Sequence, residues 1–254
     1  MPTQAEKAAQ FAALHQKGNP IVLFNIWDAG SARAVEAAGA KALATGSHPI
    51  ANALGLDDGE GAPLEDMLWV LAHICAATDL PVSHDTERGY GETPDEVAET
   101  CRRVIGAGAI GVNIEDTVSR GVLRDMDEQV ARYSAARAGL DAACPGAWLN
   151  ARCDVFLAMQ DDPVEDQIAE IARRAVAYKA VGADSLFVPF QRDLDVLARV
   201  CAAVPLPVNL FRGLDSPPIA EFAAAGAARI SHGHNPWVAA MDLIEVKAGE
   251  LYAG

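Results

Sequence analysis

The sequence predicts an α/β protein, a single (βα)8 TIM-type barrel with parallel strands over residues 1–254. Eight short apolar segments alternate with runs of helical length. Four Ala-rich runs end in glycine just before such a segment, where glycine can supply the left-handed residue that closes a helix; these are Gly39, Gly108, Gly182 and Gly226. A capping residue followed by proline, typical of a helix start, occurs at Thr93-Pro94, Asp162-Pro163, Ser216-Pro217 and Asn235-Pro236.

The elements follow in order. A helix is expected near residues 3–17, and a short helical tail at the C-terminus, where little chain follows Met241. The strands are apolar along their whole length, which is typical of parallel strands buried on both faces. They are expected near residues 21–26, 42–46, 81–85, 110–115, 147–152, 184–189, 206–211 and 228–232. A doubly wound sheet is the alternative architecture. No linker or composition shift divides the chain.

Composition limits the classes of partner. The net charge of −15 argues against nucleic acid or an anionic membrane surface as partner. No apolar run is long enough to span a membrane, and the polar N-terminus does not resemble a signal peptide. The five cysteines are scattered without a metal-binding spacing, as in a reduced protein, so a cytoplasmic location is expected.

The most informative segment is residues 81–92. Asp85 and Glu87 end a buried strand, and their spacing of two points both carboxylates to one side of an extended backbone. Two like charges there favour a hard divalent cation with oxygen ligands. The structural alternative is a solvated acidic turn before the helix that starts at Thr93-Pro94.

Polar residues close most of the other strands as well. In a (βα)8 barrel the carboxyl ends of the strands form the active-site face. The residues expected there include Trp27, Thr45, Gly46, Ser47, His48, Asp58, His84, Asn113, Glu115, Asp116, Asn150, Arg152, Asp154, Asn209, Arg212, Ser231, His232 and His234.

Six segments carry a family resemblance. They are residues 24–33 (FNIWDAGSAR), 44–47 (ATGS), 57–60 (DDGE), 85–91 (DTERGYG), 113–116 (NIED) and 150–154 (NARCD). In this order they resemble the isocitrate lyase/phosphoenolpyruvate mutase superfamily, over nearly the whole chain. The resemblance implies a (βα)8 barrel that holds Mg²⁺, or Mn²⁺, and a 2-oxo or 2-hydroxy acid.

The resemblance also implies roles for single residues. Asp85 would ligate the metal, and Asp58, Glu87 and Glu115 would hold its waters. Glu115, Arg152 and Asp58 are the expected catalytic residues. The expected substrate-binding residues are Trp27, Gly46, Ser47, Arg152, Asn209 and His232.

One loop departs from the family pattern. Isocitrate and methylisocitrate lyases carry a Cys in the loop after the fourth strand, and the phosphonate-forming mutases carry a Lys and an Asn there. This chain has residues 116–121 (DTVSRG). The departure argues against those lyase activities and against phosphonate chemistry. Arg120 and Arg124 in residues 117–125 are expected to help close the site.

The function expected is therefore that of a Mg²⁺-dependent lyase. It would cleave a C–C bond of a small carboxylic acid through a metal-stabilised enolate, with decarboxylase or hydrolytic variants included. The first alternative is a phosphonate P–C bond mutase or hydrolase, and the second a non-catalytic carboxylic-acid-binding protein. A weaker alternative is an amidohydrolase whose metal is held by His232 and His234. Relatives form oligomers with exchanged C-terminal helices; a homo-dimer or homo-tetramer is expected here, although the short tail argues against the exchange.

Several residues also have plain structural interpretations. Arg152 could pair only with Asp154 on the same strand face. His232 could be a satisfied polar residue, and Trp27 could be ordinary packing. Cys153 lies between Arg152 and Asp154, so alternation turns it toward the helices and away from the site.

Overall fold

Eight parallel strands form one sheet in the computed structural model, which describes residues 2–253. The sheet order is β1-β10-β9-β8-β7-β4-β3-β2. Ile26 and Thr45, just beyond β1 and β2, form a parallel bridge that joins the two ends of the sheet. The (βα)8 barrel is confirmed. Its strands are β1 (Ile21–Leu23), β2 (Leu43–Ala44), β3 (Val82–Asp85), β4 (Gly111–Glu115), β7 (Trp148–Arg152), β8 (Ser185–Val188), β9 (Val208–Phe211) and β10 (Arg229–Ser231).

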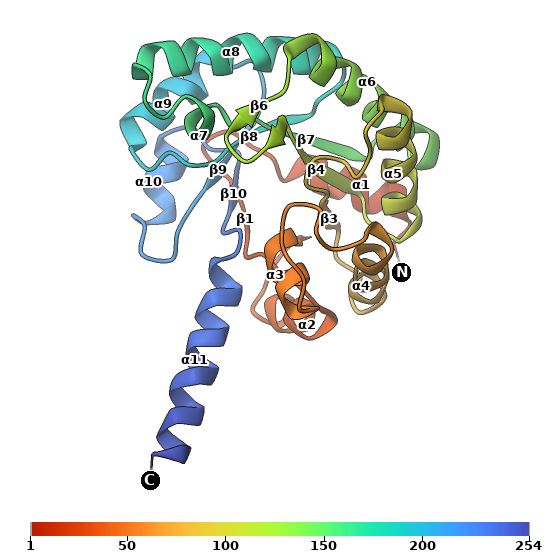
Figure 1. Cartoon of the computed structure of the whole chain (residues 1–254), viewed down its shortest axis with the longest axis vertical. Coiled ribbons are helices and arrows are strands. Elements are labelled where there is room, and N and C mark those ends of the chain that lie inside the picture. The colour runs from red at the N-terminus through yellow and green to blue at the C-terminus, as the bar shows by residue number, and fades with distance from the viewer. Residues whose placement is uncertain (1, 254) are drawn as a thin grey trace.

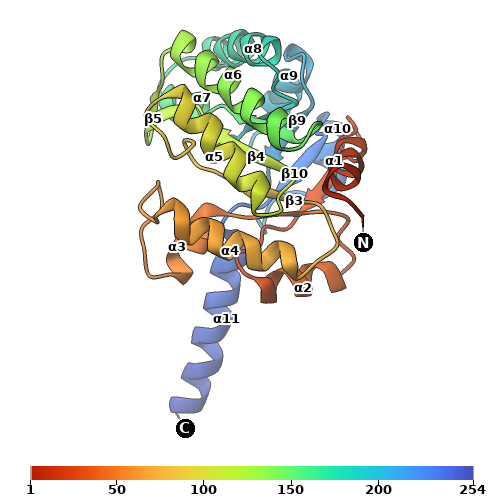
Figure 2. The same ribbon diagram turned by 90° about the vertical axis from the view of Figure 1, so that its right-hand side faces the viewer.

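Helices alternate with these strands and surround the sheet (Figures 1 and 2). They are α1 (Gln4–Ala13), α2 (Ala29–Ala37), α3 (Ser47–Ala53), α4 (Leu64–Ala76), α5 (Pro94–Gly106), α6 (Met126–Ala143), α7 (Val155–Ala158), α8 (Val164–Ala180), α9 (Leu194–Ala203), α10 (Ile219–Ala224) and α11 (Asn235–Tyr252).

Local sequence explains where many of these helices begin and end. The four glycines expected after helices have positive φ angles of 98°, 108°, 94° and 99° at Gly39, Gly108, Gly182 and Gly226. Thr93 caps α5, with the Thr93 side chain and Glu96 forming a reciprocal capping box. At α10 the helix begins at Ile219 rather than at the expected Ser216-Pro217.

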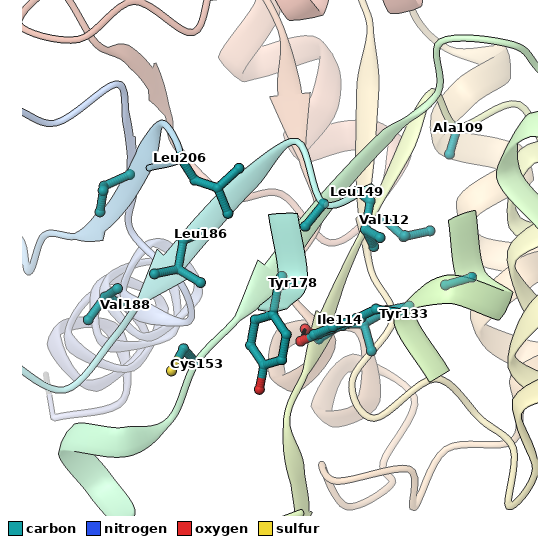
Figure 3. Close-up of a cluster of buried hydrophobic side chains, with 14 of the residues drawn as sticks. Ala109, Val112, Ile114, Tyr133, Leu149, Cys153, Tyr178, Leu186, Val188 and Leu206 are labelled. Carbon is teal, nitrogen blue, oxygen red and sulfur yellow. Dashed lines mark hydrogen bonds between the residues drawn. The ribbon is translucent and has the colours of Figure 1, made fainter. Parts of the chain in front are cut away.

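The hydrophobic core lies between the outer face of the strands and the helices. Ile114, Leu149 and Leu186 point outward from β4, β7 and β8, and Tyr133 of α6 and Tyr178 of α8 cover them (Figure 3). Cys153 is buried in this layer, as the strand alternation predicted. The opposite faces of the same strands therefore remain for the barrel interior.

The barrel interior is polar for most of its length. Its buried side chains include Ser83, Asn113, Asn150, Ser185, Asn209 and Ser231. At the amino end, Phe11 and His15, from α1 and the turn after it, pack on Trp148 of β7, with ring centroids 5.9 and 4.2 Å away. This aromatic floor closes the barrel opposite the carboxyl ends of the strands.

Two short elements at the carboxyl ends were not expected from the sequence. Helix α3 begins at Ser47, directly after β2, and strands β5 (Thr117–Ser119) and β6 (Val122–Leu123) form an antiparallel hairpin after β4. We call residues 117–123 the β5–β6 hairpin. Strands β5 and β6 are short and mostly exposed, so they lack the continuous apolar sequence that revealed the barrel strands.

The C-terminal segment is helical, and its helix begins at the expected Asn235-Pro236 start. Helix α11 has 18 residues, of which Pro236 alone is buried. It projects away from the barrel in both views (Figures 1 and 2). The exposed length of α11 is therefore accessible to another copy of the chain.

Among the described residues, the helices are all too short or too polar to traverse a lipid bilayer.

Candidate active site

A cavity of about 450 Å³ opens at the carboxyl ends of the strands. Six of the residues to which the resemblance gave a role line it: Gly46, Ser47, Asp58, Asp85, Arg152 and Asn209. Its wall also includes Asn25, His48, Ser83, His84, Asn113, Arg120, Phe187, Phe190, Arg192, Arg229, Ser231 and His234. Residues from distant parts of the sequence thus meet at the face where the fold predicts a site.

Asp85 is held at the end of β3 by two donors. The backbone N–H of Ser47 donates to Oδ2 over 3.1 Å, and the amide of Asn113 donates to Oδ1 over 3.0 Å. The backbone N–H of Asp85 donates in turn to Thr45 Oγ1 over 2.9 Å. These contacts fix the orientation of the carboxylate.

Asn113, one of the two donors to Asp85, ends a series of hydrogen bonds that crosses the barrel interior. Trp148 Nε1 donates to Ser185 Oγ over 2.8 Å, and Ser185 Oγ donates to Asn150 Oδ1 over 2.6 Å. Asn150 Nδ2 then donates to Asn113 Oδ1 over 2.8 Å. Every donor in this series points toward Asp85, so the bonds are aligned and hold the Asn113 amide in the orientation that donates to Asp85.

Glu87 is buried beside other acids. The Tyr90 hydroxyl donates to Oε1 over 2.8 Å, and the backbone N–H of Glu60 donates to Oε2. Burial raises the pKa of Glu87 to about 8, and the charges of Asp85 and Asp58 act in the same direction. Its φ angle of 49° is in the left-handed region, which is uncommon outside glycine. Such a strained, charge-crowded carboxylate is a frequent property of functional sites.

Glu115 and Arg152 form an ion pair across neighbouring strands. Their Oε2 and Nη1 atoms are 2.8 Å apart, and Arg152 also donates to Asp154 through Nε and Nη2, each over 2.7 Å. Burial raises the pKa of Glu115 to about 7, against the effect of Arg152. The pairing with Asp154 that the sequence left open is therefore present, and much of the Arg152 charge is already neutralised. A substrate-clamping role for Arg152 stays a prediction.

The carboxylates around Asp85 suit a Mg²⁺ site in which the protein supplies few direct ligands. Nowhere in residues 2–253 do three His, Cys, Asp or Glu side chains converge closely enough to enclose an ion. Mg²⁺ keeps several waters and is commonly held by one or two carboxylates together with its substrate. Asp85 on the cavity wall, with Glu87 and Glu115 acting electrostatically on its surroundings, fits that pattern.

Two predicted substrate-binding residues are not brought to the cavity. His232 is 4% exposed; its backbone N–H donates to Asn25 Oδ1, and its Nδ1 lies 3.2 Å from the carbonyl oxygen of Leu23. Trp27 packs against the core. Neither is among the lining residues. These surroundings match the structural interpretations of the two residues, a satisfied polar His232 and a packed Trp27. A metal site at His232 and His234 would also need a third ligand, and residues 2–253 supply none.

The β5–β6 hairpin lies at one side of the cavity, and hydrogen bonds from α8 hold the residues that flank it. Arg120 at its tip lines the cavity, whereas Arg124 pairs with Glu128. The buried Asp116 accepts from Tyr178 Oη over 2.7 Å and from Arg174 Nη1 over 3.1 Å. Arg174 Nη2 also donates to the backbone carbonyl of Arg124 over 3.0 Å. Of the two arginines expected to close the site, Arg120 alone is placed to do so.

Arg229 is a cavity residue that the sequence interpretation missed. It lies in β10, is 3% exposed, and lines the cavity. Burial lowers the pKa of Arg229 to about 10, with Asp85 acting in the opposite direction. The available signal was an arginine inside an otherwise apolar strand (Ala228-Arg229-Ile230), since a fully buried arginine is rare unless paired.

Comparison with known proteins adds a family assignment to this geometry. A family model described as phosphoenolpyruvate phosphomutase matches residues 11–252. The 2-methylisocitrate lyase of Escherichia coli is 31% identical over 208 residues, which cover 78% of this chain and 67% of that enzyme. An oxaloacetate decarboxylase of Rhodopseudomonas palustris is 30% identical over 199 residues, covering 75% of this chain and 65% of that enzyme.

A solved structure from Burkholderia cenocepacia has the same fold over its full length. That protein, provisionally named a phosphonomutase, is 48% identical to this chain. The match has a TM-score of 0.92 and covers 99% of this chain and 100% of the other.

Proposed function

The chain belongs to the isocitrate lyase/phosphoenolpyruvate mutase superfamily, and from this premise we propose that it is a Mg²⁺-dependent lyase acting on a small carboxylic acid. The enzyme would cleave a C–C bond next to a 2-oxo or 2-hydroxy group, with decarboxylation as one form of the reaction. The observation that carries the proposal is Asp85 on the cavity wall, fixed by two donors and near enough to Glu87 for its charge to raise the pKa of that carboxyl. Mn²⁺ could replace Mg²⁺ at such a site.

The proposal assigns separate tasks to residues that line the cavity and to Glu87 and Glu115, which lie outside its lining. Asp85 would hold the metal directly, with Asp58, Glu87 and Glu115 binding its waters. A bound Mg²⁺ would supply Lewis-acid stabilisation of the negative charge that develops as the bond breaks. Gly46, Ser47 and Asn209 would orient the substrate from the wall of the cavity. The Arg120 tip of the β5–β6 hairpin would exclude water.

The proton chemistry would not use a thiol. The β5–β6 hairpin contains no cysteine, and Cys153, next to Arg152 in the chain, is buried in the outer core. Burial raises the pKa of Cys153 well above its usual value, so its reactive thiolate is suppressed. This supports a reaction other than isocitrate or methylisocitrate cleavage.

Phosphonate chemistry is the second candidate, because the Burkholderia cenocepacia protein at 48% identity bears a phosphonomutase name. The hairpin sequence TVSRG lacks the Lys and Asn that the phosphonate-forming mutases carry in this loop. The two candidates share the metal-side carboxylates and differ in the leaving group.

A substrate panel with and without Mg²⁺ tests the proposal. It would contain C4–C7 2-oxo and 2-hydroxy diacids and phosphonopyruvate, with pyruvate, glyoxylate, CO₂ and phosphate followed separately. We expect turnover of a carboxylic acid that is lost in EDTA and restored by Mg²⁺. Full turnover by EDTA-treated protein would show that the metal assignment is wrong, and turnover of phosphonopyruvate alone would favour the second candidate.

Variants of two cavity residues complete the test. Asp85→Ala should abolish turnover and leave the fold intact by circular dichroism, because the Ser47 and Asn113 donors line the cavity, where water can replace the carboxylate as their acceptor. Asp195→Asn, on an exposed position of α9, is the matched control and should keep wild-type activity. Arg152→Lys should lower kcat/KM at least about tenfold, since a point charge replaces the planar fork that contacts both Glu115 and Asp154.

A further inference from the structure

The cavity contains a buried cation without a partner, the guanidinium of Arg229. Its Nε and Nη1 atoms are buried and have no hydrogen-bond partner among residues 2–253. A buried charge is costly unless it is paired and hydrogen-bonded. Arg229 therefore has donors available for a group that the protein itself does not provide.

The surroundings of Arg229 direct these donors toward the cavity. Its Cζ lies 5.8 Å from the ring centroid of Phe11, so the aromatic floor closes the side facing the amino end of the barrel. Because Arg229 alternates with the outward-pointing Ile230, its side chain belongs to the barrel interior, and it forms part of the cavity wall. A ligand entering the cavity from above can reach the guanidinium.

A second unpartnered donor lies on the neighbouring strand. Asn209 of β9 is in register with Arg229, is 1% exposed, and has no partner for its Nδ2 among the described residues. Its orientation is fixed, because Ser231 Oγ donates to its Oδ1 over 3.1 Å. The deep end of the cavity is therefore rich in donors and poor in acceptors.

The other arginines of the cavity are in different situations. Arg152 is ion-paired to Glu115 and Asp154, and Arg120 and Arg192 are exposed to solvent. Within residues 2–253, Arg229 thus combines burial with the absence of an acid at ion-pair distance.

We infer that Arg229, together with the amide of Asn209, binds a second carboxylate of the substrate in the barrel interior below the metal-side carboxylates. The inference rests on the proposed function and assigns the residue that selects a diacid over a monoacid at the end of the substrate away from the metal. A planar guanidinium recognises a carboxylate through two parallel hydrogen bonds, and Asn209 can supply a third donor. Arg229, rather than the ion-paired Arg152, then supplies the charge that distinguishes a diacid from a monoacid.

Calorimetric binding to the Mg²⁺-loaded protein tests this without turnover. Malate and lactate share the 2-hydroxy carboxylate end and differ in one carboxylate. The wild-type protein should bind malate at least ~10-fold more tightly than lactate, as expected for a buried charge-assisted pair. In Arg229→Met the ratio should fall to near one while lactate affinity changes little. Arg199→Met, which removes an exposed arginine of α9, should keep the wild-type ratio.

Stability gives a second readout that does not involve the ligand. Replacing an unpaired buried charge with an apolar side chain of similar length should raise the Tm of the ligand-free protein. Asn209→Asp is the second variant, needed if Arg229→Met fails to fold. It places a carboxylate beside Arg229, and should raise Tm and remove the preference for malate.

Three results would overturn the inference. The first is an unchanged malate/lactate ratio in Arg229→Met or, if that variant does not fold, in Asn209→Asp. The second is loss of the ratio in Arg120→Met but not in Arg229→Met. The third is a chloride-dependent rise in the wild-type Tm that Arg229→Met abolishes without changing the ratio, since the site would then hold an inorganic anion. If the ratio depends on Arg229 but no substrate turns over, the binding site stands and the proposed lyase function fails.

Discussion

Glu87 has the most perturbed environment of the predicted metal-side residues. It has a positive φ angle, it is buried, and its pKa is about 8. Glu115 is shifted in the same direction, with a pKa of about 7. Both carboxyls therefore bind a proton more tightly in the folded protein than in the unfolded chain.

This shift predicts a pH dependence of stability in EDTA. A folded-state pKa above the unfolded value gives stabilisation that is present below pH about 4.5 and is lost as the pH rises through about 8. Glu87→Gln should remove most of the loss of folding stability that Glu87 causes as the pH rises. That loss is at most about 1.4 kcal/mol for each pKa unit between the folded and unfolded states. Thermal unfolding at pH 5 and pH 8.5 measures it.

Mg²⁺ provides the internal control for that experiment. A cation beside the carboxylates should lower their pKa values, so the wild-type loss between the two pH values should shrink when Mg²⁺ is added. Equal pH dependence in wild type and Glu87→Gln would contradict the assignment of the shift to this residue.

At the scale of elements, the base of the β5–β6 hairpin depends on a buried ionic network. Asp116, at 0% exposure, holds Arg174 and Tyr178 of α8 and the backbone N–H of Asp154. The network links the ends of β4 and β7 to α8 and, through the Arg124 carbonyl, to the hairpin. The position of the hairpin tip over the cavity therefore depends on residues far from it in sequence.

Urea unfolding of a double-mutant cycle should reveal this network. Arg174→Met should cost about 3 kcal/mol or more because it leaves Asp116 without its counter-charge, and Tyr178→Phe about 1 kcal/mol. The double variant Asp116→Asn/Arg174→Met should be destabilised by less than the sum of the single variants, with a coupling of about 1–3 kcal/mol. Strict additivity would show that the two side chains do not interact.

The cysteines belong to elements turned away from the chemistry. Cys75, Cys101 and Cys201 lie in α4, α5 and α9, Cys144 ends α6, and Cys153 faces the outer core. A variant with all five replaced by Ala or Ser should keep kcat/KM within about tenfold, roughly 1.4 kcal/mol of transition-state stabilisation. Isocitrate and methylisocitrate cleavage should be negligible in variant and parent. Strong isocitrate cleavage lost on replacing one cysteine would refute this assignment.

The elements also show why sequence predicted the barrel better than the site. Glycines that follow helices and continuous apolar strand sequences are local signals, and together they located all eight strands. The tasks of His232 and Arg229 depend on contacts made across the fold. The Asn25 side chain accepts from the His232 backbone across 207 positions of sequence, and Phe11 from α1 lies under Arg229. No local pattern could therefore separate the structural histidine from the cavity arginine.

At the scale of the whole molecule, α11 exposes several large apolar side chains to solvent. Leu243, Ile244 and Val246 are each more than half exposed, and Leu251 and Tyr252 are 80% and 90% exposed. Large contiguous apolar surface on a folded protein usually marks an interface. We therefore expect a homo-oligomer in which another copy of the chain covers α11.

Light scattering after size exclusion tests this expectation. The wild-type protein should have the mass of a dimer or tetramer, and Leu243→Glu combined with Ile244→Glu should reduce it, because charges in an apolar contact are not compensated. Val176→Glu introduces the same charge at a similarly exposed position of α8 and should leave the mass unchanged. A monomeric wild type at micromolar concentration would refute the expectation.

The polar interior of the barrel has a calorimetric consequence. Many α/β barrels fill this space with branched aliphatic side chains, whereas here asparagines and serines form the chain of bonds that leads to Asp85. Exposing apolar groups raises the heat capacity on unfolding, and exposing polar groups lowers it. The heat-capacity change of this protein should therefore be smaller than that of an aliphatic-filled barrel of equal length. Its free energy of unfolding should accordingly vary less steeply with temperature.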